Sequence, residues 1–324
     1  MTEFLSHSAV EDALHWPQLI EQLRNWFADG KVEAPPRQVL SIPAPAGSKA
    51  SDPGSMLIMP AWLPGEALGV KVVTYCPWNA SQGEATINAG YMLFNGATGK
   101  LQTVLDGDAL TIRRTAAASA LAADYLARND ARHHLIVGTG QLARSVGEAY
   151  ASVRAPKKIS VWGRNPEKAL QIARELARVG LPAEAVTNLK LACEKADIVS
   201  TVTASQSPIV QGDWLRPGTH LDLIGSFRAD MRESDDLAIS QAEVFVDDRA
   251  GAQLAGDLAQ PLATGHLQPN DIKADLKSLC CGEHPGRTSK NSYTVFKSAG
   301  VSLEDLAAAV QVNTVARENR STAC

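Results

Sequence analysis

The stretch Leu135-Ile136-Val137-Gly138-Thr139-Gly140-Gln141-Leu142-Ala143 decides the fold of this chain. A short apolar strand leads into two glycines that are one residue apart, and an amphipathic helix follows. This order matches the G-x-G-x-x-G/A fingerprint of dinucleotide-binding units. Gly138 permits the tight turn, Gly140 lets the backbone approach a pyrophosphate at the helix N-terminus, and Ala143 allows close helix–strand packing. A glycine pair alone could be a plain turn, but its position between a strand and a helix predicts a cofactor site that includes Gly138, Thr139, Gly140, Gln141 and Leu142.

The end of the next expected strand indicates which dinucleotide binds. An NAD site usually carries an acid there that accepts a hydrogen bond from the ribose 2′-hydroxyl. Here the chain reads Val161-Trp162-Gly163-Arg164-Asn165-Pro166, with no acid before Glu167. Arg164 can pair with a 2′-phosphate instead, although it could also be a solvated turn residue. The sequence therefore favours NADPH, with NADH still possible.

Further strands and helices alternate on both sides of this motif. Short apolar strands are expected at His134–Val137, Ile159–Trp162, Asp197–Thr201, Thr219–Ile224 and Glu243–Val246. Helical spacing separates them at Gln141–Val153, Pro166–Val179 and Asn188–Lys195. This alternation implies parallel strands joined by right-handed crossovers. We predict an α/β fold class with a Rossmann-type doubly wound parallel sheet.

The first third of the chain has a different pattern. Apolar residues from Val10 to Phe27 follow helical spacing, although Pro17 suggests that the helix starts there. Prolines between residues 35 and 67 leave only short strands, and a hairpin is expected where Gly96-Ala97-Thr98-Gly99 joins two β-rich segments. This region predicts an α+β domain with a mostly antiparallel sheet. A last helix over Ser302–Asn319, with Ser302 as N-cap and Asp305 three residues on, could return to it.

Composition excludes several classes of protein. The 324 residues carry 31 basic and 35 acidic side chains, a net charge of −4, which argues against nucleic-acid and anionic-membrane binding. No stretch approaches the roughly 20 apolar residues of a membrane helix. The first 16 residues contain acidic side chains and no basic region before an apolar run, so they are not expected to be a secretory signal. Five scattered cysteines do not form a disulfide framework, and vicinal Cys280-Cys281 predicts no metal site. A cytoplasmic enzyme is expected. His133-His134, before a strand, is expected to face solvent.

Four motifs in register resemble the ornithine cyclodeaminase/mu-crystallin family, and the resemblance spans nearly the whole chain. They are Val-Lys-Val-Val-Thr at 70–74, Arg114-Thr115-Ala116-Ala117, the Gly138–Gln141 turn and Val295–Gly300. The resemblance implies a homodimer with a discontinuous substrate and dimerisation domain, residues 1–115 with 302–324. It also implies a Rossmann domain at residues 116–301, with the active site in the cleft.

The resemblance assigns Arg37, Lys71 and Arg114 to the substrate carboxylate, and fixed cations suit that task. Any one of them could instead be an ordinary surface cation. Arg113 is adjacent, but neighbours in an extended segment point opposite ways, so one of the pair is expected to face the site. Lys71 lies between two valines of an apolar strand. Burial there would lower its pKa into the acid–base range.

One departure from the family is informative. Cyclodeaminases and some alanine dehydrogenases carry an aspartate, which activates water or substrate, where this chain has Phe227 in Gly225-Ser226-Phe227-Arg228-Ala229-Asp230-Met231-Arg232-Glu233. An aromatic side chain cannot activate water, and Asp222 upstream is expected to be structural. The segment resembles the branch that reduces cyclic imines, although Ala229 replaces a proline common there.

The expected reaction is NAD(P)H-dependent reduction of Δ1-pyrroline-2-carboxylate and/or Δ1-piperideine-2-carboxylate to L-proline or L-pipecolate. Arg37, Lys71 and Arg114 would hold the carboxylate, with Lys71 or a bound water supplying the proton. Ser226 and Ser298 would line the nicotinamide pocket, and Thr203-Ala204-Ser205 would touch the cofactor. Two alternatives stay open: an ornithine cyclodeaminase or alanine dehydrogenase-type enzyme, and a non-catalytic small-ligand binder like mu-crystallin.

Overall fold

The computed structural model describes residues 3–46 and 53–322, and the chain divides into two compact units. The first consists of Met1–Gln22, Asp29–Arg114 and Val301–Cys324, and the second of Leu23–Ala28 and Thr115–Gly300. The expected boundaries differ by one residue at 115 and at 301, and they did not separate residues 23–28 from the first unit. The boundary after Arg114 falls inside one long helix, α3 (Gly107–Leu126).

The first unit is built on a six-stranded sheet that is antiparallel except where β1 runs parallel to β6. This confirms the mostly antiparallel sheet and the hairpin at residues 96–99. In spatial order the strands are β1 (Glu3–Leu5), β6 (Leu101–Asp106), β5 (Ile87–Asn95), β4 (Ala67–Tyr75), β3 (Gly54–Leu63) and β2 (Gln38–Ile42). Besides α3, the other elements that begin in this unit are α1 (His7–Ala13), α2 (Trp16–Asp29), η1 (Pro77–Gln82) and α11 (Ser302–Thr322).

Two helices replace the single early one that the periodicity suggested. Ser6 caps α1 by accepting a hydrogen bond from the Ala9 amide, and α2 then begins at Trp16 with Pro17 in its first turn. Proline is tolerated there because the first amides of a helix have no partner inside it. Pro17 therefore marks a helix start, as its position indicated.

One face of the first sheet is buried against α11, which contacts β3, β4, β5 and β6. The registers align Leu105, Tyr91, Lys71 and Met59 in one row, and all four are buried. Residues opposite one another on neighbouring strands share a face, so Lys71 points into the sheet–helix interior from a central strand. The end of the chain thus packs over a strand more than 200 residues earlier.

The region around Arg113 and Arg114 is helical, so the expectation of an extended segment is wrong. In α3 the two side chains diverge because successive helical residues are about 100° apart. The Arg113 guanidinium lies 3.5 Å above the Trp16 ring and donates to the Leu14 carbonyl. Arg114 points elsewhere, toward α11. The two arginine side chains therefore point in different directions because of the helix geometry, and each has its own partners.

The second unit is the doubly wound α/β domain that the sequence predicted, with eight strands, all parallel. In spatial order they are β13 (Ile272–Asp275), β12 (Ala242–Val246), β14 (Tyr293–Lys297), β11 (His220–Leu223), β10 (Ile198–Thr201), β7 (His133–Val137), β8 (Lys158–Trp162) and β9 (Ala183–Ala185). The five expected strands are present, and β9, β13 and β14 were missed. Of these, β14 is the most consequential, because it lies between β11 and β12 in the sheet.

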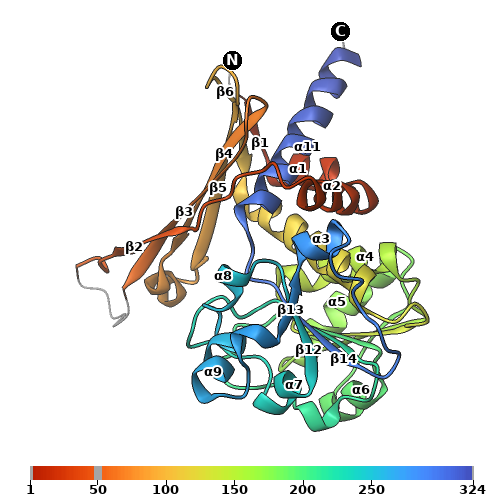
Figure 1. The fold of residues 1–324 in the computed structure, drawn as a ribbon. Helices are drawn as coiled ribbons and strands as arrows, with labels where there is room; N and C mark the ends of the chain where they lie inside the picture. Colours follow the sequence, from red (N-terminus) through yellow and green to blue (C-terminus); the bar gives the residue numbers. More distant parts are fainter. Residues whose placement is uncertain (1–2, 47–52, 323–324) are drawn as a thin grey trace. The chain divides into compact units, whose positions relative to one another are not determined.

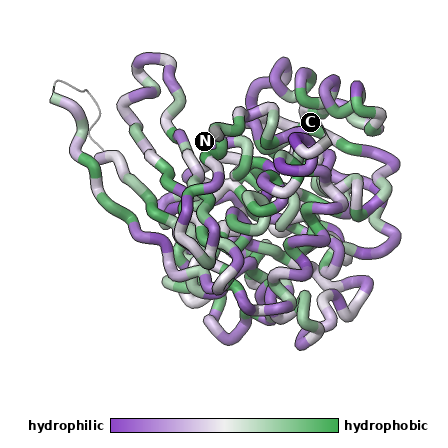
Figure 2. The backbone as a smooth tube through the Cα atoms, turned by 90° about the horizontal axis from the view of Figure 1, so that it is seen from above, coloured by the Kyte–Doolittle hydropathy of each residue, from purple (hydrophilic) through white to green (hydrophobic). Residues whose placement is uncertain are grey.

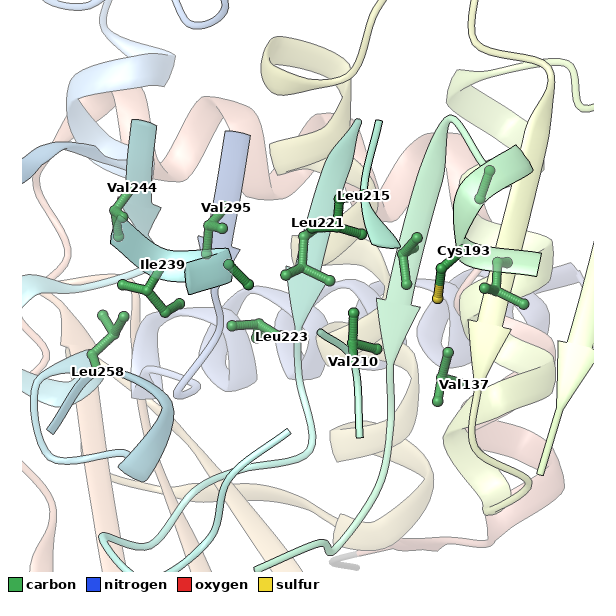
Figure 3. Close-up of a cluster of buried hydrophobic side chains, with 14 of the residues drawn as sticks. Val137, Cys193, Val210, Leu215, Leu221, Leu223, Ile239, Val244, Leu258 and Val295 are labelled. Carbon is green, nitrogen blue, oxygen red and sulfur yellow. The ribbon is translucent and has the colours of Figure 1, made fainter. Parts of the chain in front are cut away.

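Helices cover both faces of this parallel sheet. Figure 3 shows one side of the core, where Leu221 and Leu223 of β11 share a hydrophobic cluster with Ile239 and Leu258 from the covering helices. On the other face Ile136 packs with residues of α4 and α5. Hydrophobic residues, green in Figure 2, are interspersed with hydrophilic ones along the backbone. The helices of this unit after α3 are α4 (Gln141–Val153), α5 (Pro166–Arg178), α6 (Leu189–Lys195), η2 (Gly212–Trp214), α7 (Asp236–Ser240), α8 (Arg249–Ala252), α9 (Gly256–Thr264), η3 (Pro269–Asp271) and α10 (Leu276–Cys280).

Two further expectations concern membranes and cysteines. None of the helices in the described ranges is long and apolar enough to cross a membrane. Cys76, Cys193, Cys280 and Cys281 are free thiols, and Cys324 lies outside the described residues.

A buried polar network joins the helices to the parallel sheet around Asp222. The Tyr150 hydroxyl donates to Asp222 at 2.6 Å, and the Ser119 hydroxyl at 3.3 Å. His134 stacks on Tyr150 with ring centroids 4.5 Å apart, and its Nε2 lies 2.9 Å from the Ser200 hydroxyl. The expectation that this histidine faces solvent is therefore wrong for His134. Asp222 has the structural surroundings expected of it.

Burial raises the pKa of Asp222 to about 7, because desolvation outweighs the hydroxyl donors. Between about pH 4 and 7 the folded protein thus keeps a proton that the unfolded chain has released. Its contribution to the free energy of unfolding then falls as pH rises through that window. Asp222→Asn, which stays neutral, should remove this fall, measured by urea unfolding at pH 5 and 7.5. The exposed Asp213→Asn is the control, and an unchanged pH slope in Asp222→Asn would contradict the assignment.

Candidate active site

The glycine turn after β7 contains two glycines that are needed for different reasons. Gly138 has φ of +134°, and a Cβ there would lie 2.7 Å from the Val202 carbonyl oxygen. The backbone conformation and the close approach at position 138 therefore require glycine. Gly140 is the N-cap of α4 with φ of −78°, and a Cβ there would meet no atom within 4 Å. Packing does not demand a glycine at 140, so the open space is available to a ligand.

The strand order places this turn where a doubly wound sheet binds ligands. From β7 the chain proceeds to β8 and β9 on one side, and then to β10 and β11 on the other. Ligands bind outside the carboxyl ends of the strands at such a switch point. The unpaired amides and partial positive charge at the N-terminus of α4 suit a pyrophosphate. The residues present therefore fit a dinucleotide.

The end of β8 lies directly beside the glycine turn. A Cβ on Gly163 would come within 2.5 Å of the Thr139 methyl group. Arg164 follows with an exposed side chain, and the Asn165 side chain caps α5 by accepting from the Glu167 and Lys168 amides. Arg164 is thus held next to the turn by a capped helix start.

Thr203, Ser226 and Ser298 follow β10, β11 and β14 at the same sheet edge, but their hydroxyls are turned to the protein. Thr203 donates to Glu233 at 2.8 Å. Ser226 donates to the Met231 carbonyl at 3.1 Å, and Ser298 to Asp247 at 3.3 Å. The remaining predicted residues of the turn differ in exposure: Gln141 is exposed, and Thr139 and Leu142 are half-buried.

In the first unit, Lys71 and Arg114 meet on one carboxylate. Lys71 Nζ and Arg114 Nε each lie 2.8 Å from Oδ1 of Asp305, and Arg114 Nη1 lies 2.6 Å from Oε2 of Glu304. Lys71 is only 1% exposed, and both acids are fully buried. Desolvation, and secondly the charge of Arg114, lower the pKa of Lys71 to about 8, against the opposing effect of Asp305. The expected lowering of this pKa by burial is confirmed.

The sequence reasoning missed Glu304 and Asp305 as members of this cluster. It interpreted Asp305 as part of a capping box, whereas its carboxylate contacts Lys71 and Arg114. A signal was present: the two acids start a helix that continues Leu-Ala-Ala-Ala, so its packed face includes them. Acids buried with an apolar helix face need cationic partners.

Tyr91 adds a buried hydroxyl to the same row. It is directly opposite Lys71, and burial, with the charge of Asp305, raises its pKa. Within the described part of the chain, Tyr91 Oη and Asp305 Oδ2 have no hydrogen-bond partner. A buried donor and acceptor of this kind can receive a polar ligand or water.

Arg37 immediately precedes β2, at the edge of the same sheet. Gln38 is opposite Ile58, and Met59 is opposite Lys71, so Arg37 lies about two strand spacings, or roughly 10 Å, from the Lys71 row. The structure thus brings two of the three predicted cations, Lys71 and Arg114, together on the carboxylate of Asp305, and it places Arg37 two strands away at the edge of the same sheet.

Comparison with known proteins gives one consistent result. The family model for ornithine cyclodeaminase/mu-crystallin matches residues 2–320. A Δ1-pyrroline-2-carboxylate reductase of Paracoccus denitrificans is 36% identical over 306 residues, 94% of each chain. The Δ1-pyrroline-2-carboxylate reductase of Thermococcus litoralis, solved with NADH and L-proline, superposes with a TM-score of 0.90 at 32% identity, covering 98% of both chains. An archaeal alanine dehydrogenase dimer with bound NAD also has a TM-score of 0.90, at 27% identity, covering 98% of this chain and 97% of that one.

The two glycines of the turn should separate stability from binding. Gly140→Ala should keep the free energy of unfolding near that of the wild type, because the site has room and ordinary φ, yet weaken NAD(P)H binding at least 10-fold. Gly138→Ala should instead lower the free energy of unfolding by about 1–3 kcal/mol, because of its left-handed backbone and the clash with Val202. Cofactor fluorescence titration and urea unfolding measure the two effects. Tight binding by Gly140→Ala would place the pyrophosphate elsewhere.

Proposed function

This chain belongs to the ornithine cyclodeaminase/mu-crystallin family, and we propose that it reduces cyclic ketimine carboxylates with NAD(P)H. The substrates are Δ1-pyrroline-2-carboxylate and/or Δ1-piperideine-2-carboxylate, and the products L-proline and L-pipecolate. Phe227 is the residue that favours imine reduction over the other reactions of the family. It stands 42% exposed just after β11, at the position where the family resemblance implies an aspartate in the deaminating members. Without that carboxylate, the substrate must already be an electrophile, as a cyclic imine is.

The second unit provides the cofactor site in this proposal. A bound nicotinamide cofactor supplies the hydride for the imine carbon. Gly138 and Gly140 bring the backbone close to the pyrophosphate, and the start of α4 stabilises its charge. Arg164 pairs with a 2′-phosphate and makes NADPH the preferred form. The similar structures with NADH or NAD make the NADH comparison an essential part of the test.

The first unit provides the carboxylate site and the proton. Glu304 and Asp305 already balance the charges of Lys71 and Arg114, so a substrate carboxylate adds a negative charge that Arg37 offsets. With a pKa of about 8, Lys71 is mostly protonated at neutral pH and can still release a proton to the imine nitrogen. The hydroxyl of Tyr91 is a further donor for the bound substrate.

In the first unit, the sheet face that points away from α11 supports a homodimer. The registers align Phe4, Val104, Met92, Val70 and Pro60 in one row on the face opposite Lys71. Among the apolar side chains of this face, Phe4, Leu40, Leu68 and Met92 are more than one-third exposed. A contiguous apolar surface of this kind usually marks a protein interface. A second copy of the chain is the partner we propose, and the enzyme is proposed to act in the cytoplasm.

An amino-acid dehydrogenase is the second candidate, because the archaeal alanine dehydrogenase has the same overall fold. A non-catalytic ligand binder is the third. NADPH oxidation at 340 nm with Δ1-pyrroline-2-carboxylate tests all three candidate functions. We expect rapid turnover with NADPH and slower turnover with NADH. NAD⁺ reduction with L-alanine, or ammonia release from L-ornithine, would instead support the other enzymes. NADPH binding without any turnover would support the binder.

Arg164→Ala tests the cofactor preference in the same assay. Its loss should raise the KM for NADPH at least 10-fold and leave that for NADH nearly unchanged, because only NADPH has the 2′-phosphate. Lys168→Ala, an exposed cation in the next helix, is the control. Equal effects on both cofactors would exclude a 2′-phosphate contact.

Lys71 should control the alkaline limb of the pH profile. If it donates the proton, kcat/KM falls above about pH 8, where the amine deprotonates. Lys71→Met should reduce kcat by about 100-fold or more and abolish that limb. Asp305→Asn removes an interaction that raises this pKa, so it should move the limb to lower pH. The exposed Lys100→Met serves as control, and an unchanged rate in Lys71→Met would exclude the donor role.

Met92→Asp should disrupt the proposed dimer, because it puts a charge at the centre of the exposed apolar row. Sedimentation analysis should give twice 34.5 kDa for the wild type and 34.5 kDa for the variant. Ala97→Asp, in the exposed hairpin turn, should stay dimeric. A monomeric wild type would assign this face to another partner.

A further inference from the structure

Three charged side chains are completely buried at the carboxyl edge of the parallel sheet, in the second unit. They are Glu233, Asp257 and Lys297, each 0% exposed. Lys297 Nζ, at the end of β14, lies 3.5 Å from Asp257 Oδ2 and donates to the Leu223 carbonyl at 3.0 Å. Asp257 Oδ1 accepts from the backbone amides of Glu233 at 2.8 Å and Ser234 at 3.2 Å. The lysine–aspartate pair therefore fixes the backbone of Glu233.

Glu233 in turn joins the ends of two neighbouring strands. Its Oε1 accepts from the Thr203 amide at 2.7 Å and the Thr203 hydroxyl at 2.8 Å, just after β10. Its Oε2 accepts from the Gly225 amide at 2.7 Å, just after β11. Both amides lie beyond the regular strands, so this one carboxylate replaces the ladder partners that they lack.

The packing around these bonds leaves no room for adjustment. A Cβ on Gly225 would lie 2.0 Å from the Thr203 carbonyl oxygen and 2.6 Å from Glu233 Oε1. One residue before Thr203, the Val202 carbonyl oxygen is the atom that a Cβ on Gly138 would strike. A continuous set of close contacts therefore runs from Glu233 through residues 202–203 to the glycine turn.

Burying three charges is expensive, and a packed apolar cluster would stabilise the fold as well or better. The three buried charges are therefore better explained by the backbone segments that they hold in place. We propose that Glu233, oriented by Asp257 and Lys297, is a positioning residue that holds the Thr203 and Gly225 segments against the glycine turn, so that the cofactor pocket is formed before the cofactor binds. The expected effect of Glu233 on catalysis rests on the proposed function, whereas its expected effect on cofactor binding does not.

Glu233→Gln tests the proposal with a near-isosteric change. The glutamine oxygen can still accept from Thr203, but its amide group meets the Gly225 amide as a second donor. The Kd for NADPH should rise at least 10-fold, and kcat should fall by up to about 100-fold. The KM for the imino acid, whose proposed ligands belong to the first unit, should change less than 3-fold. Hydrogen exchange of peptides that contain Thr203 and Gly225 should accelerate.

Glu184→Gln, on the edge strand β9 with a partly exposed side chain, is the matched control and should bind NADPH as the wild type does. A Kd for NADPH within 2-fold of the wild type in Glu233→Gln would overturn the proposal. If that variant fails to fold, exchange in the wild type decides: the Thr203 and Gly225 amides should be strongly protected, and unprotected exchange would overturn it. Absence of imine turnover in the wild type would refute the proposed function and leave the binding and exchange tests intact.

Discussion

The ion cluster of Lys71, Arg114, Glu304 and Asp305 is the interaction on which the first unit depends. It joins a central strand and α3 to the first turn of α11, since Glu304 comes 190 residues after Arg114 and Asp305 comes 234 residues after Lys71 in the chain. All four side chains are buried, so removing any one leaves a charge without compensation, at a cost of about 3–5 kcal/mol. The requirement for charge balance therefore fixes α11 on the sheet and places a lysine of lowered pKa inside the protein.

In the second unit the main constraint is close backbone packing, and a glycine satisfies it. At the carboxyl edge of the parallel sheet the glycine turn and the Val202 segment approach so closely that only Gly138 fits. Figure 1 shows the helices surrounding the strands of this unit. In the proposed function, proton chemistry and carboxylate recognition belong to one unit, and dinucleotide recognition to the other. Such a division suits a redox reaction between a small acid and a large cofactor.

Much of this was predictable from local sequence. The strand, the glycines and the helix at 135–153 are contiguous, and further strands and helices alternate along the chain. This local periodicity and turn chemistry were sufficient to predict the parallel α/β fold. The helical state of Arg113 and Arg114 was not, since two arginines after a hairpin resemble an extended segment. Nor was β14, a strand of five residues that ends in Lys297. Its buried lysine is explained by Asp257, which comes from α9, and by the Leu223 carbonyl, which accepts from it.

The functional residues divide in the same way. The glycine turn was found because two glycines with one residue between them follow a strand. Lys71 was found because the family resemblance points to it and because a charge between two valines is unusual. Glu304 and Glu233 were not recognised as site residues, and Asp305 was interpreted as a capping residue, because acids near helix starts and in polar loops are ordinary. Their importance comes from partners distant in sequence, and tertiary packing alone reveals those. Likewise, the Ser226 and Ser298 hydroxyls proved to bond within the protein.

Isotope transfer tests the central claim of imine reduction most directly. The enzyme would be incubated with Δ1-pyrroline-2-carboxylate and NADPH deuterated at C4 of the nicotinamide, on each face in turn, and the product examined by NMR. The account predicts L-proline with deuterium at C2 from one of the two cofactors. Cofactor that stays fully deuterated from both faces, with no labelled proline formed, would contradict it.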